Sequence, residues 1–193
     1  MERLITAPGI SGDSIRHIMR ISALCDGRIK VKNCFKIPLE YKDLPRVGLL
    51  FRLPLALDTA EYIGLGPHEN YRDRDASVLF GQYIAPFSEL PDHYVMPQSA
   101  GNRTGVQKLT LRGKTASITF AAMDAPFEFS HLPYSDEEIF GARHWHELGK
   151  QKFWYLHLDA IQRGIGASSC GPFLNERYFV PTGIFHLDFT IEF

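Results

Sequence analysis

The sequence predicts an all-β domain of antiparallel strands with one short helix, and three observations support this prediction. Glycine and proline, 16 and 12 of the 193 residues, are spread along the whole chain and divide it into short segments. Phenylalanine and tyrosine, with 14 and 8 residues, are types that favour strands. Several segments alternate polar and apolar side chains, which is the period of a strand with one buried face. No shift in composition divides the chain, so we expect one domain over residues 1–193.

The predicted strands are the segments in which this alternation, or a run of β-forming residues, lies between turn residues. Asp26–Gly27 follows the first segment and predicts a two-residue hairpin turn, because both positions tolerate positive φ. The last segment is expected to turn four apolar side chains towards the core: Phe185, Leu187, Phe189 and Ile191. The predicted strands cover residues 15–21, 28–37, 46–53, 59–65, 106–111, 117–122, 127–131, 153–158, 177–180 and 183–193.

One segment predicts a helix. Ser135 begins a capping box in which its hydroxyl accepts a backbone N–H and Glu138 reaches back, and Gly149 is expected to end the helix. His144 and His146 lie two residues apart on this helix, so we expect them to point away from each other and not to chelate one metal ion. His144 is expected to be a hydrogen-bonded helix residue, with a binding role as the alternative.

The balance of charge argues against binding to nucleic acid or to an anionic membrane. The chain carries 21 Lys and Arg against 22 Asp and Glu, a formal net charge of −1, whereas either partner requires a basic face. No apolar run approaches the roughly 20 residues of a membrane-spanning helix. The first residues lack the basic-then-apolar order of a signal peptide. We therefore expect a soluble, cytoplasmic protein, or a periplasmic one if the chain is a fragment of an exported protein.

The cysteines give no sign of a disulfide scaffold or of a thiolate metal site. Cys25, Cys34 and Cys170 are an odd number, and no CxxC pair is present. Each is expected to be a small buried hydrophobic residue.

The densest group of unusual residues runs from Tyr62 to Arg74. Its two arginines and two carboxylates lie close in sequence, and we expect bidentate Arg–carboxylate pairs that pin a loop. Binding of sugar hydroxyls is the alternative function of this group. Its four charged residues are Glu69, Arg72, Asp73 and Arg74.

A second group, from Met96 to Arg103, contains a Gly101–Asn102 pair that predicts a turn. Gln98, Asn102 and Arg103 are expected to cap backbone groups of this turn, and contact with a polyol is the alternative. The third group is a loop rich in glycine and serine that follows the strand near Leu158 and continues to Pro172. Loops on a rigid sheet commonly carry ligand contacts, so functional and structural interpretations of this loop stay equally open.

Taken in order, these groups resemble the C-terminal domain of bacterial β-galactosidases of glycoside hydrolase family two, which also forms the small chain of two-subunit members. Residues 62–74, YIGLGPHENYRDR, are similar to the GxGPxExYxDR signature of that family. The resemblance runs from about Gly27 to the C-terminus. It continues through Leu44–Gly48, Tyr94–Gln98, Gly101–Arg103, Leu132–Ser135, Ala142, His144, Leu158–Asp159, Gln162, Gly164–Gly166 and Cys170–Pro172.

The resemblance implies an antiparallel β-supersandwich that is galactose-mutarotase-like. It also implies a role in the hydrolysis of galactosides without catalytic residues, because the family carries its catalytic glutamates on a separate (β/α)8 barrel. A loop with Ser168, Ser169 and Cys170 is expected to line the galactose pocket, with Cys170 at a position where the family has Trp or Cys. No metal or cofactor is expected in this chain, and any Mg or Na ions belong to the full enzyme.

The remaining candidate site residues are expected to have a structural role, and binding of the sugar is the second possibility. They are Glu69, Asp73, Arg74, Asn102, Arg103 and His144. The expected partners are a galactoside and a catalytic-barrel chain or domain, with no nucleic acid and no membrane.

The chain departs from the family pattern in two places. Ser99–Ala100 stands where the family usually has a glutamate, so a polar contact made by that glutamate is expected to be missing. Nothing matches the Arg-x-Pro-Thr-Asp-Asn-Asp segment of the family, and we expect the first strands of the domain to be lacking. An exposed sheet edge would then favour self-association or binding to a larger hydrolase chain, which a monomeric mass in size-exclusion chromatography would contradict.

Two other functions remain open from the sequence. An aldose 1-epimerase of the same fold would need a histidine as general acid and a glutamate as base, for which His157, His93 and Glu69 are the candidates. A stand-alone carbohydrate-binding module would need no catalytic pair at all.

Overall fold

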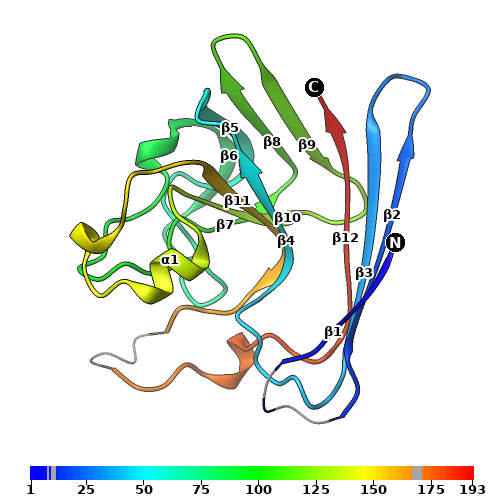
Figure 1. Ribbon diagram of the computed structural model, residues 1–193, viewed down its shortest axis with the longest axis vertical. Helices are drawn as coiled ribbons and strands as arrows, with labels where there is room; N and C mark the ends of the chain where they lie inside the picture. Colours follow the sequence, from blue (N-terminus) through cyan, green and yellow to red (C-terminus); the bar gives the residue numbers. More distant parts are fainter. Residues whose placement is uncertain (8, 10–11, 167–170) are drawn as a thin grey trace.

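The computed structural model, which describes residues 1–7, 9, 12–166 and 171–193, contains two antiparallel sheets (Figure 1). The large sheet has the order β1 (Glu2–Ile5), β2 (Ile15–Ala23), β3 (Ile29–Ile37), β12 (Gly183–Glu192), β9 (Ser117–Ala122), β8 (Lys108–Gly113), β5 (Leu57–Gly66), β6 (Leu79–Pro86). The small sheet has the order β4 (Arg46–Leu53), β11 (Trp154–Gln162), β10 (Phe127–Leu132), β7 (Arg103–Val106). The predicted all-β antiparallel sandwich is confirmed.

Aromatic side chains from both sheets meet in the core. Phe51 of β4 contacts Phe120 of β9 and Phe189 of β12, with ring centroids 5.4 and 6.4 Å apart. Tyr62 of β5 meets the edge of Phe129 of β10 at 5.3 Å. Each buried side chain of this size contributes about 1.5–3 kcal/mol through its removal from water, so these contacts hold the two sheets together.

The alternation in the last strand is confirmed. Leu187 and Phe189 are fully buried, whereas Ile184 on the other face is 61% exposed. The turn at Asp26–Gly27 is also present, with Gly27 at a φ of 88°. It is longer than predicted, because the last pair of β2 and β3 joins Ala23 to Ile29 and leaves a five-residue connection over 24–28.

The predicted helix is wrong in length. The capping box at Ser135 is present, but α1 covers Asp136–Gly141 only and Ala142 adopts an extended backbone. A short 3-10 helix, η2 (Trp145–Glu147), follows. Ile139 is the buried residue of α1, so packing supports little more than one turn.

Further differences concern strands and short helices elsewhere in the chain. Strands β1, β6 and β7 were not predicted, and the strand predicted over 106–111 is β8. Strand β6 lies at an edge of the sheet with Leu79, Phe80 and Ile84 exposed. The predicted strand at 177–180 is instead the 3-10 helix η3 (Glu176–Tyr178). A third 3-10 helix, η1 (Phe87–Glu89), follows β6.

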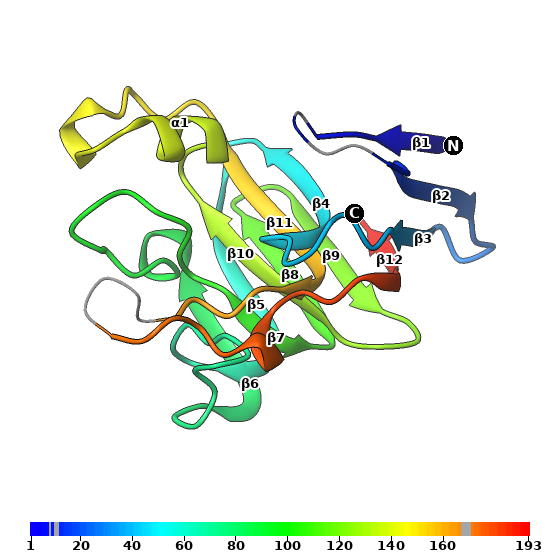
Figure 2. The same cartoon turned by 90° about the horizontal axis from the view of Figure 1, so that it is seen from below.

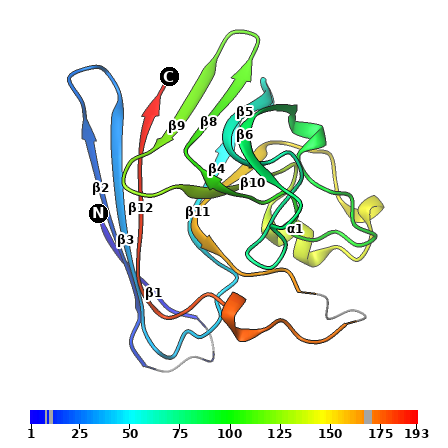
Figure 3. The same ribbon diagram turned by 180° about the vertical axis from the view of Figure 1, so that it is seen from behind.

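The connections that carry the candidate site gather at one end of the molecule. Helix α1 lies on the side away from strands β1, β2 and β3 in all three views (Figures 1, 2 and 3). Among the described residues, no helix combines the length and the hydropathy that crossing a membrane requires.

Candidate functional site

The segment from Gly64 to Arg74, called the signature segment below, leaves strand β5 and holds a distant loop. The carboxylate of Asp73 accepts hydrogen bonds from the backbone N–H groups of Ile165 and Gly166 at 3.0 and 2.8 Å. Arg74 donates to the carbonyl oxygen of Gly166 at 2.9 Å. A Cβ atom at Gly164 would lie 2.7 Å from Asp73 Oδ1, so only glycine fits there. Residues 164–166 are therefore fixed against the signature segment.

The returning end of the same loop is held as well. Arg72 donates to the carbonyl oxygen of Phe179 at 2.8 Å, and the N–H of Gly164 donates to the carbonyl of Tyr178 at 3.1 Å. Arg163 forms an ion pair with Asp43 at 2.8 Å, and its guanidinium lies 5.0 Å from the centre of the Phe179 ring. Both described ends of this loop are thus bonded to the sheet framework.

The prediction of Arg–carboxylate pairs within the signature segment is wrong in its partners. The segment does pin a loop, but Arg72, Asp73 and Arg74 bond to backbone groups of the loop and not to each other. The physical reason is that the N–H and C=O groups of an irregular loop have no sheet partners, and charged side chains satisfy them.

Glu69 connects the signature segment to the turn near Gly101. Its carboxylate accepts from the N–H of Gly101 at 2.6 Å, from the Tyr71 hydroxyl at 3.3 Å and from the Tyr94 hydroxyl. Burial, together with the hydrogen bond to Glu69, raises the pKa of Tyr94 to about 12, so this hydroxyl stays a donor at neutral pH. Burial also raises the pKa of Tyr71.

Asn102 and Arg103 are buried beneath this turn. Asn102 donates to Glu128 at 2.8 Å and to the carbonyl of Asn70 at 3.1 Å. Arg103, which is 3% exposed, donates to three backbone carbonyls, those of Leu90 at 2.6 Å, Gly101 at 2.8 Å and Pro67 at 3.0 Å. This geometry favours capping of the backbone over contact with a polyol.

The predicted sugar-contacting residues Ser168, Ser169 and Cys170 lie outside the described residues, and their role stays a prediction. Of the other cysteines, Cys25 is exposed and Cys34 is half-buried, so the expectation of buried side chains is wrong for Cys25. His144 does not lie in a helix, because it caps η2 in an extended conformation.

The expectation that His144 and His146 point apart is also wrong. Their rings stack at a centroid distance of 5.3 Å, since η2 is a tight turn preceded by extended backbone and not a continuous α-helix. His144 Nδ1 lies 2.9 Å from Glu147 Oε1.

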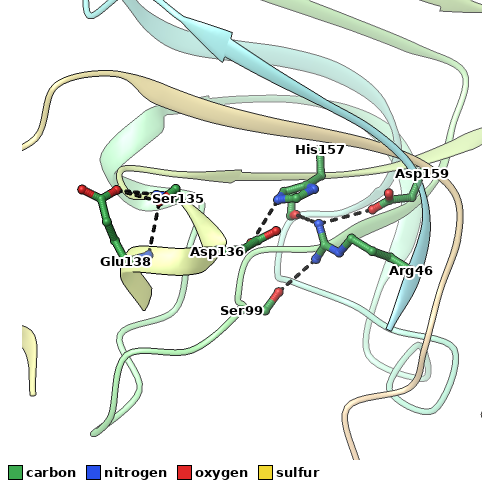
Figure 4. A network of polar contacts seen from close by, with 8 residues as sticks. Arg46, Ser99, Ser135, Asp136, Glu138, His157 and Asp159 are labelled. Atoms are coloured by element: carbon green, nitrogen blue, oxygen red, sulfur yellow. Dashed lines mark hydrogen bonds and ion pairs between the residues drawn. The ribbon is translucent and has the colours of Figure 1, made fainter. Parts of the chain in front are cut away.

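A second polar group, which our sequence analysis did not single out as a site, lies in the small sheet (Figure 4). Arg46 begins β4 and donates to the hydroxyls of Ser99 at 2.9 Å and Ser130 at 3.2 Å. It forms an ion pair with Asp159 of β11 at 3.4 Å. A Cβ atom at Gly48, which faces Asp159 in the register, would lie 2.1 Å from Asp159 Oδ1. The signal in the sequence that could have found this group is Asp159, a charged residue among the apolar residues of β11.

Burial controls the charge of this group. Asp159 is fully buried, and burial raises its pKa to about 6 although Arg46 opposes the shift. His157 Nε2 lies 3.2 Å from Asp136 Oδ1 and, as the largest cause, lowers the pKa of Asp136. The contact joins β11 to the first turn of α1, so the group positions the helix beside the small sheet.

A cavity of about 710 Å³ opens between this helix and the segment after Tyr94. Its apolar lining includes Met96, Pro97 and Phe140, and Arg46 and Gln162 supply polar groups. Gln162 directly precedes the anchored loop, so the cavity and the base of the loop adjoin. The volume is typical of a small-molecule or side-chain binding site.

Ser99 lies at the position where the family pattern usually has a glutamate, and its hydroxyl accepts a hydrogen bond from Arg46 at 2.9 Å. The expected loss of a glutamate contact at this position stays a prediction.

His131 of β10 gives a pH-dependent prediction. The ring is fully buried and lies between Phe87 and Trp154, with centroid distances of 3.8 and 4.7 Å. Within the described part of the chain neither ring nitrogen has a hydrogen-bond partner. Burial lowers the pKa of His131 to about 3. Below about pH 6.5, His131 therefore binds a proton in the unfolded chain but stays neutral in the folded chain. The free energy of unfolding falls as the pH falls from about 6.5 towards 3.

We expect His131→Phe to remove this loss. Between pH 8 and pH 5 the free energy of unfolding should fall by about 2 kcal/mol less in the variant than in the original chain, as measured by urea unfolding at both pH values. Asp159 acts with the opposite sign, because its raised pKa of about 6 costs stability as pH rises through that range, but it titrates in both proteins and cancels in the comparison. Equal pH dependence in the two proteins would contradict the prediction.

The fold and this site define a class: a β-sandwich domain whose most elaborate contacts anchor one loop beside a cavity. The family model described as beta galactosidase small chain matches residues 6–192, and the chain belongs to this family. A β-galactosidase of Actinobacillus pleuropneumoniae is 34% identical over 168 residues, which are 87% of this chain and 16% of that protein.

Two further relatives are also β-galactosidases. The one from Lactococcus lactis subsp. lactis is 29% identical over 177 residues, or 91% of this chain and 17% of that protein. The one from Streptococcus thermophilus is 28% identical over 188 residues, or 96% of this chain and 18% of that protein. The chain spans less than a fifth of the length of the curated relatives that it matches here.

The epimerase hypothesis gains nothing from the geometry. Glu69 is hydrogen-bonded to Tyr71, Tyr94 and Gly101, and His157 is bonded to Asp136. Glu69 and His157 are therefore committed to separate structural contacts and do not form an acid–base pair with each other. The ring of the third candidate, His93, lies 5.7 Å from the Trp145 ring.

Proposed function

We propose that this chain is a non-catalytic part of a β-galactosidase, which removes terminal β-D-galactose from β-galactosides such as lactose. The carboxylates that break the bond come, in this proposal, from a catalytic barrel outside residues 1–193, either as a separate chain or as another part of a longer polypeptide. Family membership and the relatives named β-galactosidase support the proposal.

The observation that carries the local part of the proposal is the double hydrogen bond from Ile165 and Gly166 to Asp73. It supports a positioning role for the signature segment, because Ile165 and Gly166 come shortly before Ser168, Ser169 and Cys170 in the chain. We propose that these three residues form one wall of the galactose pocket and help to exclude water from the glycosyl intermediate. Because a thiol offers less apolar surface than an indole, aglycones are expected to bind more weakly or differently than in relatives with Trp at this position.

The proposed partners are a galactoside and the catalytic barrel. Strand β6 is an open edge of the large sheet, with Leu79 76% exposed and Ile84 69% exposed, and an edge of this kind favours association. A second copy of the chain is the other proposed occupant of an open edge. The Mg and Na ions of such an enzyme are proposed to lie in the catalytic part.

The proposed compartment is the cytoplasm, with the periplasm as the alternative for an exported protein. Cys25 and Cys34 are free thiols, and Cys25 is exposed. Free exposed thiols persist in a reducing compartment, which supports the first choice.

The experiment is hydrolysis of a nitrophenyl β-galactoside by the purified chain, alone and combined with the catalytic part. We expect no turnover by the chain alone and turnover after assembly, with assembly checked by size-exclusion chromatography and light scattering. Turnover by the chain alone, or none from a verified assembly, would overturn the proposal. Submillimolar binding of galactose by the isolated chain in calorimetry would favour a carbohydrate-binding module instead.

A further inference from the structure

Three metal-ligating side chains converge at the turn that follows α1. His144, His146 and Glu147 each offer one donor atom, and these atoms all lie within 4.8 Å of one another. All three residues are exposed, so an ion from solution can reach them without any movement of the core. Two imidazoles and one carboxylate are the donor set of many three-ligand zinc sites that keep further positions for water.

Hydrogen bonds hold the backbone of residues 144–148, although the three side chains are exposed. The N–H of Glu147 donates to the carbonyl of His144 at 3.0 Å, and the N–H of Leu148 donates to the carbonyl of Trp145 at 3.2 Å. The Trp145 indole N–H donates to the carbonyl of Tyr94 at 2.7 Å and ties the turn to a neighbouring segment. The two histidines are therefore brought together by the fold and not by a flexible chain.

The carboxylate of Glu147 is oriented by a second hydrogen bond. The N–H of Arg143 donates to Glu147 Oε2 at 2.8 Å, while Glu147 Oε1 faces His144 Nδ1 at 2.9 Å. The Arg143 N–H therefore fixes Oε2, and Oε1 is directed towards the imidazole of His144. Hydrogen bonds of this kind, made by atoms that do not touch the metal, orient metal ligands in proteins.

We propose that His144, His146 and Glu147 bind a divalent transition-metal ion of the zinc class, with water completing the coordination. Zinc bonds of about 2.0–2.2 Å in a tetrahedral site place ligand atoms about 3.4 Å apart, so the exposed side chains close by small rotations around the ion. When His144 binds the ion through Nδ1, its neutral ring carries its proton on Nε2, and the ion takes the place of the hydrogen bond between Nδ1 and Glu147 Oε1. Imidazole donors select zinc, nickel or cobalt over magnesium. The site is independent of the proposed galactosidase role.

Calorimetric titration of the chelator-treated 193-residue chain with zinc chloride tests the proposal. We expect one site of micromolar affinity and no binding of magnesium chloride under the same conditions. His146→Ala is the most informative variant, because the described hydrogen bonds of the fold do not use that ring, and it should weaken zinc binding at least tenfold. Glu147→Gln should also weaken it, and His68→Ala, which removes another exposed histidine, should leave it unchanged.

Cobalt chloride supplies a second readout that identifies the ligands. Bound Co²⁺ should show visible d–d absorption that disappears in His144→Ala and in His146→Ala but persists in His68→Ala. Zinc binding of unchanged affinity in both histidine variants would overturn the proposal, and so would the absence of binding at millimolar zinc. Circular dichroism of each variant confirms that any loss reflects the site and not the fold.

Discussion

Replacing Arg103 by methionine is expected to lower the free energy of unfolding by about 3 kcal/mol, the largest stability effect that we expect from a single polar residue here. The guanidinium is buried and donates to the carbonyls of Leu90, Gly101 and Pro67. Methionine fills a similar volume but leaves these three acceptors without a donor, and each buried unpaired group costs about 1–3 kcal/mol. Urea unfolding measured by tryptophan fluorescence gives the value.

Arg112 provides the matched control for this prediction. Like Arg103, it donates several hydrogen bonds through its guanidinium. Its Nε and Nη2 atoms both bond to Glu61, at 3.1 and 2.7 Å, but its side chain is 54% exposed. Arg112→Met should therefore cost at most about 1 kcal/mol. If Arg103→Met is too unstable to purify, Arg103→Lys, which keeps the charge but loses the fork, should still be destabilised clearly more than Arg112→Met. Similar losses at the two positions would show that burial does not set the contribution of Arg103.

Replacing Asp73 by alanine is expected to reduce kcat/KM of the assembled enzyme for a nitrophenyl β-galactoside by about 10- to 100-fold, because a misplaced pocket wall of about 1 Å has effects of that size. The variant loses the two backbone hydrogen bonds to Ile165 and Gly166 that fix the base of the loop. The kcat/KM of Asp73→Asn should fall between those of the original enzyme and Asp73→Ala, because an amide oxygen can still accept a hydrogen bond from one of these N–H groups. Steady-state kinetics of the three proteins gives the order.

Asp75→Ala is the control for Asp73, since Asp75 is exposed and lies two residues further along the chain, directly after the signature segment. It should retain the original kcat/KM. Hydrogen exchange at Ile165 and Gly166 separates a local effect from a global one, because it should rise in Asp73→Ala without a matching loss of stability elsewhere. Full activity of Asp73→Ala with exchange unchanged would show that the signature segment does not position the loop.

The large pattern of the fold could be predicted from the sequence because it depends on local rules. Alternation located β3, β4, β9 and β12 within a residue or two, and the capping box located the start of α1 at Ser135. Strand β6 escaped because it is an edge strand in which apolar residues such as Leu79 and Ile84 occupy exposed positions, so the polarity of its side chains does not follow their burial. The helix was predicted too long, because the hydrogen bond from Trp145 to the Tyr94 carbonyl, a tertiary contact, favours a 3-10 turn.

The candidate site was predictable only in part, for a similar reason. The glycines and charges of the signature segment marked it as a loop-holding element, but the partners of Asp73 lie more than 90 residues away along the chain. The group of Arg46 and Asp159 is created by the pairing of β4 with β11, and the convergence of His144 and His146 by a change of backbone after Gly141. The spacing of residues in the sequence does not indicate which strands pair or where the backbone changes its conformation.

The most direct test of the account is to find which part of the assembled enzyme carries the nucleophile. Retaining glycosidases form a covalent glycosyl-enzyme intermediate, which an activated 2-deoxy-2-fluoro-galactoside traps. Peptide mass spectrometry after this treatment should find the sugar on a carboxylate of the catalytic part and none on residues 1–193. A stoichiometric galactosyl label on a carboxylate of this chain would contradict the account.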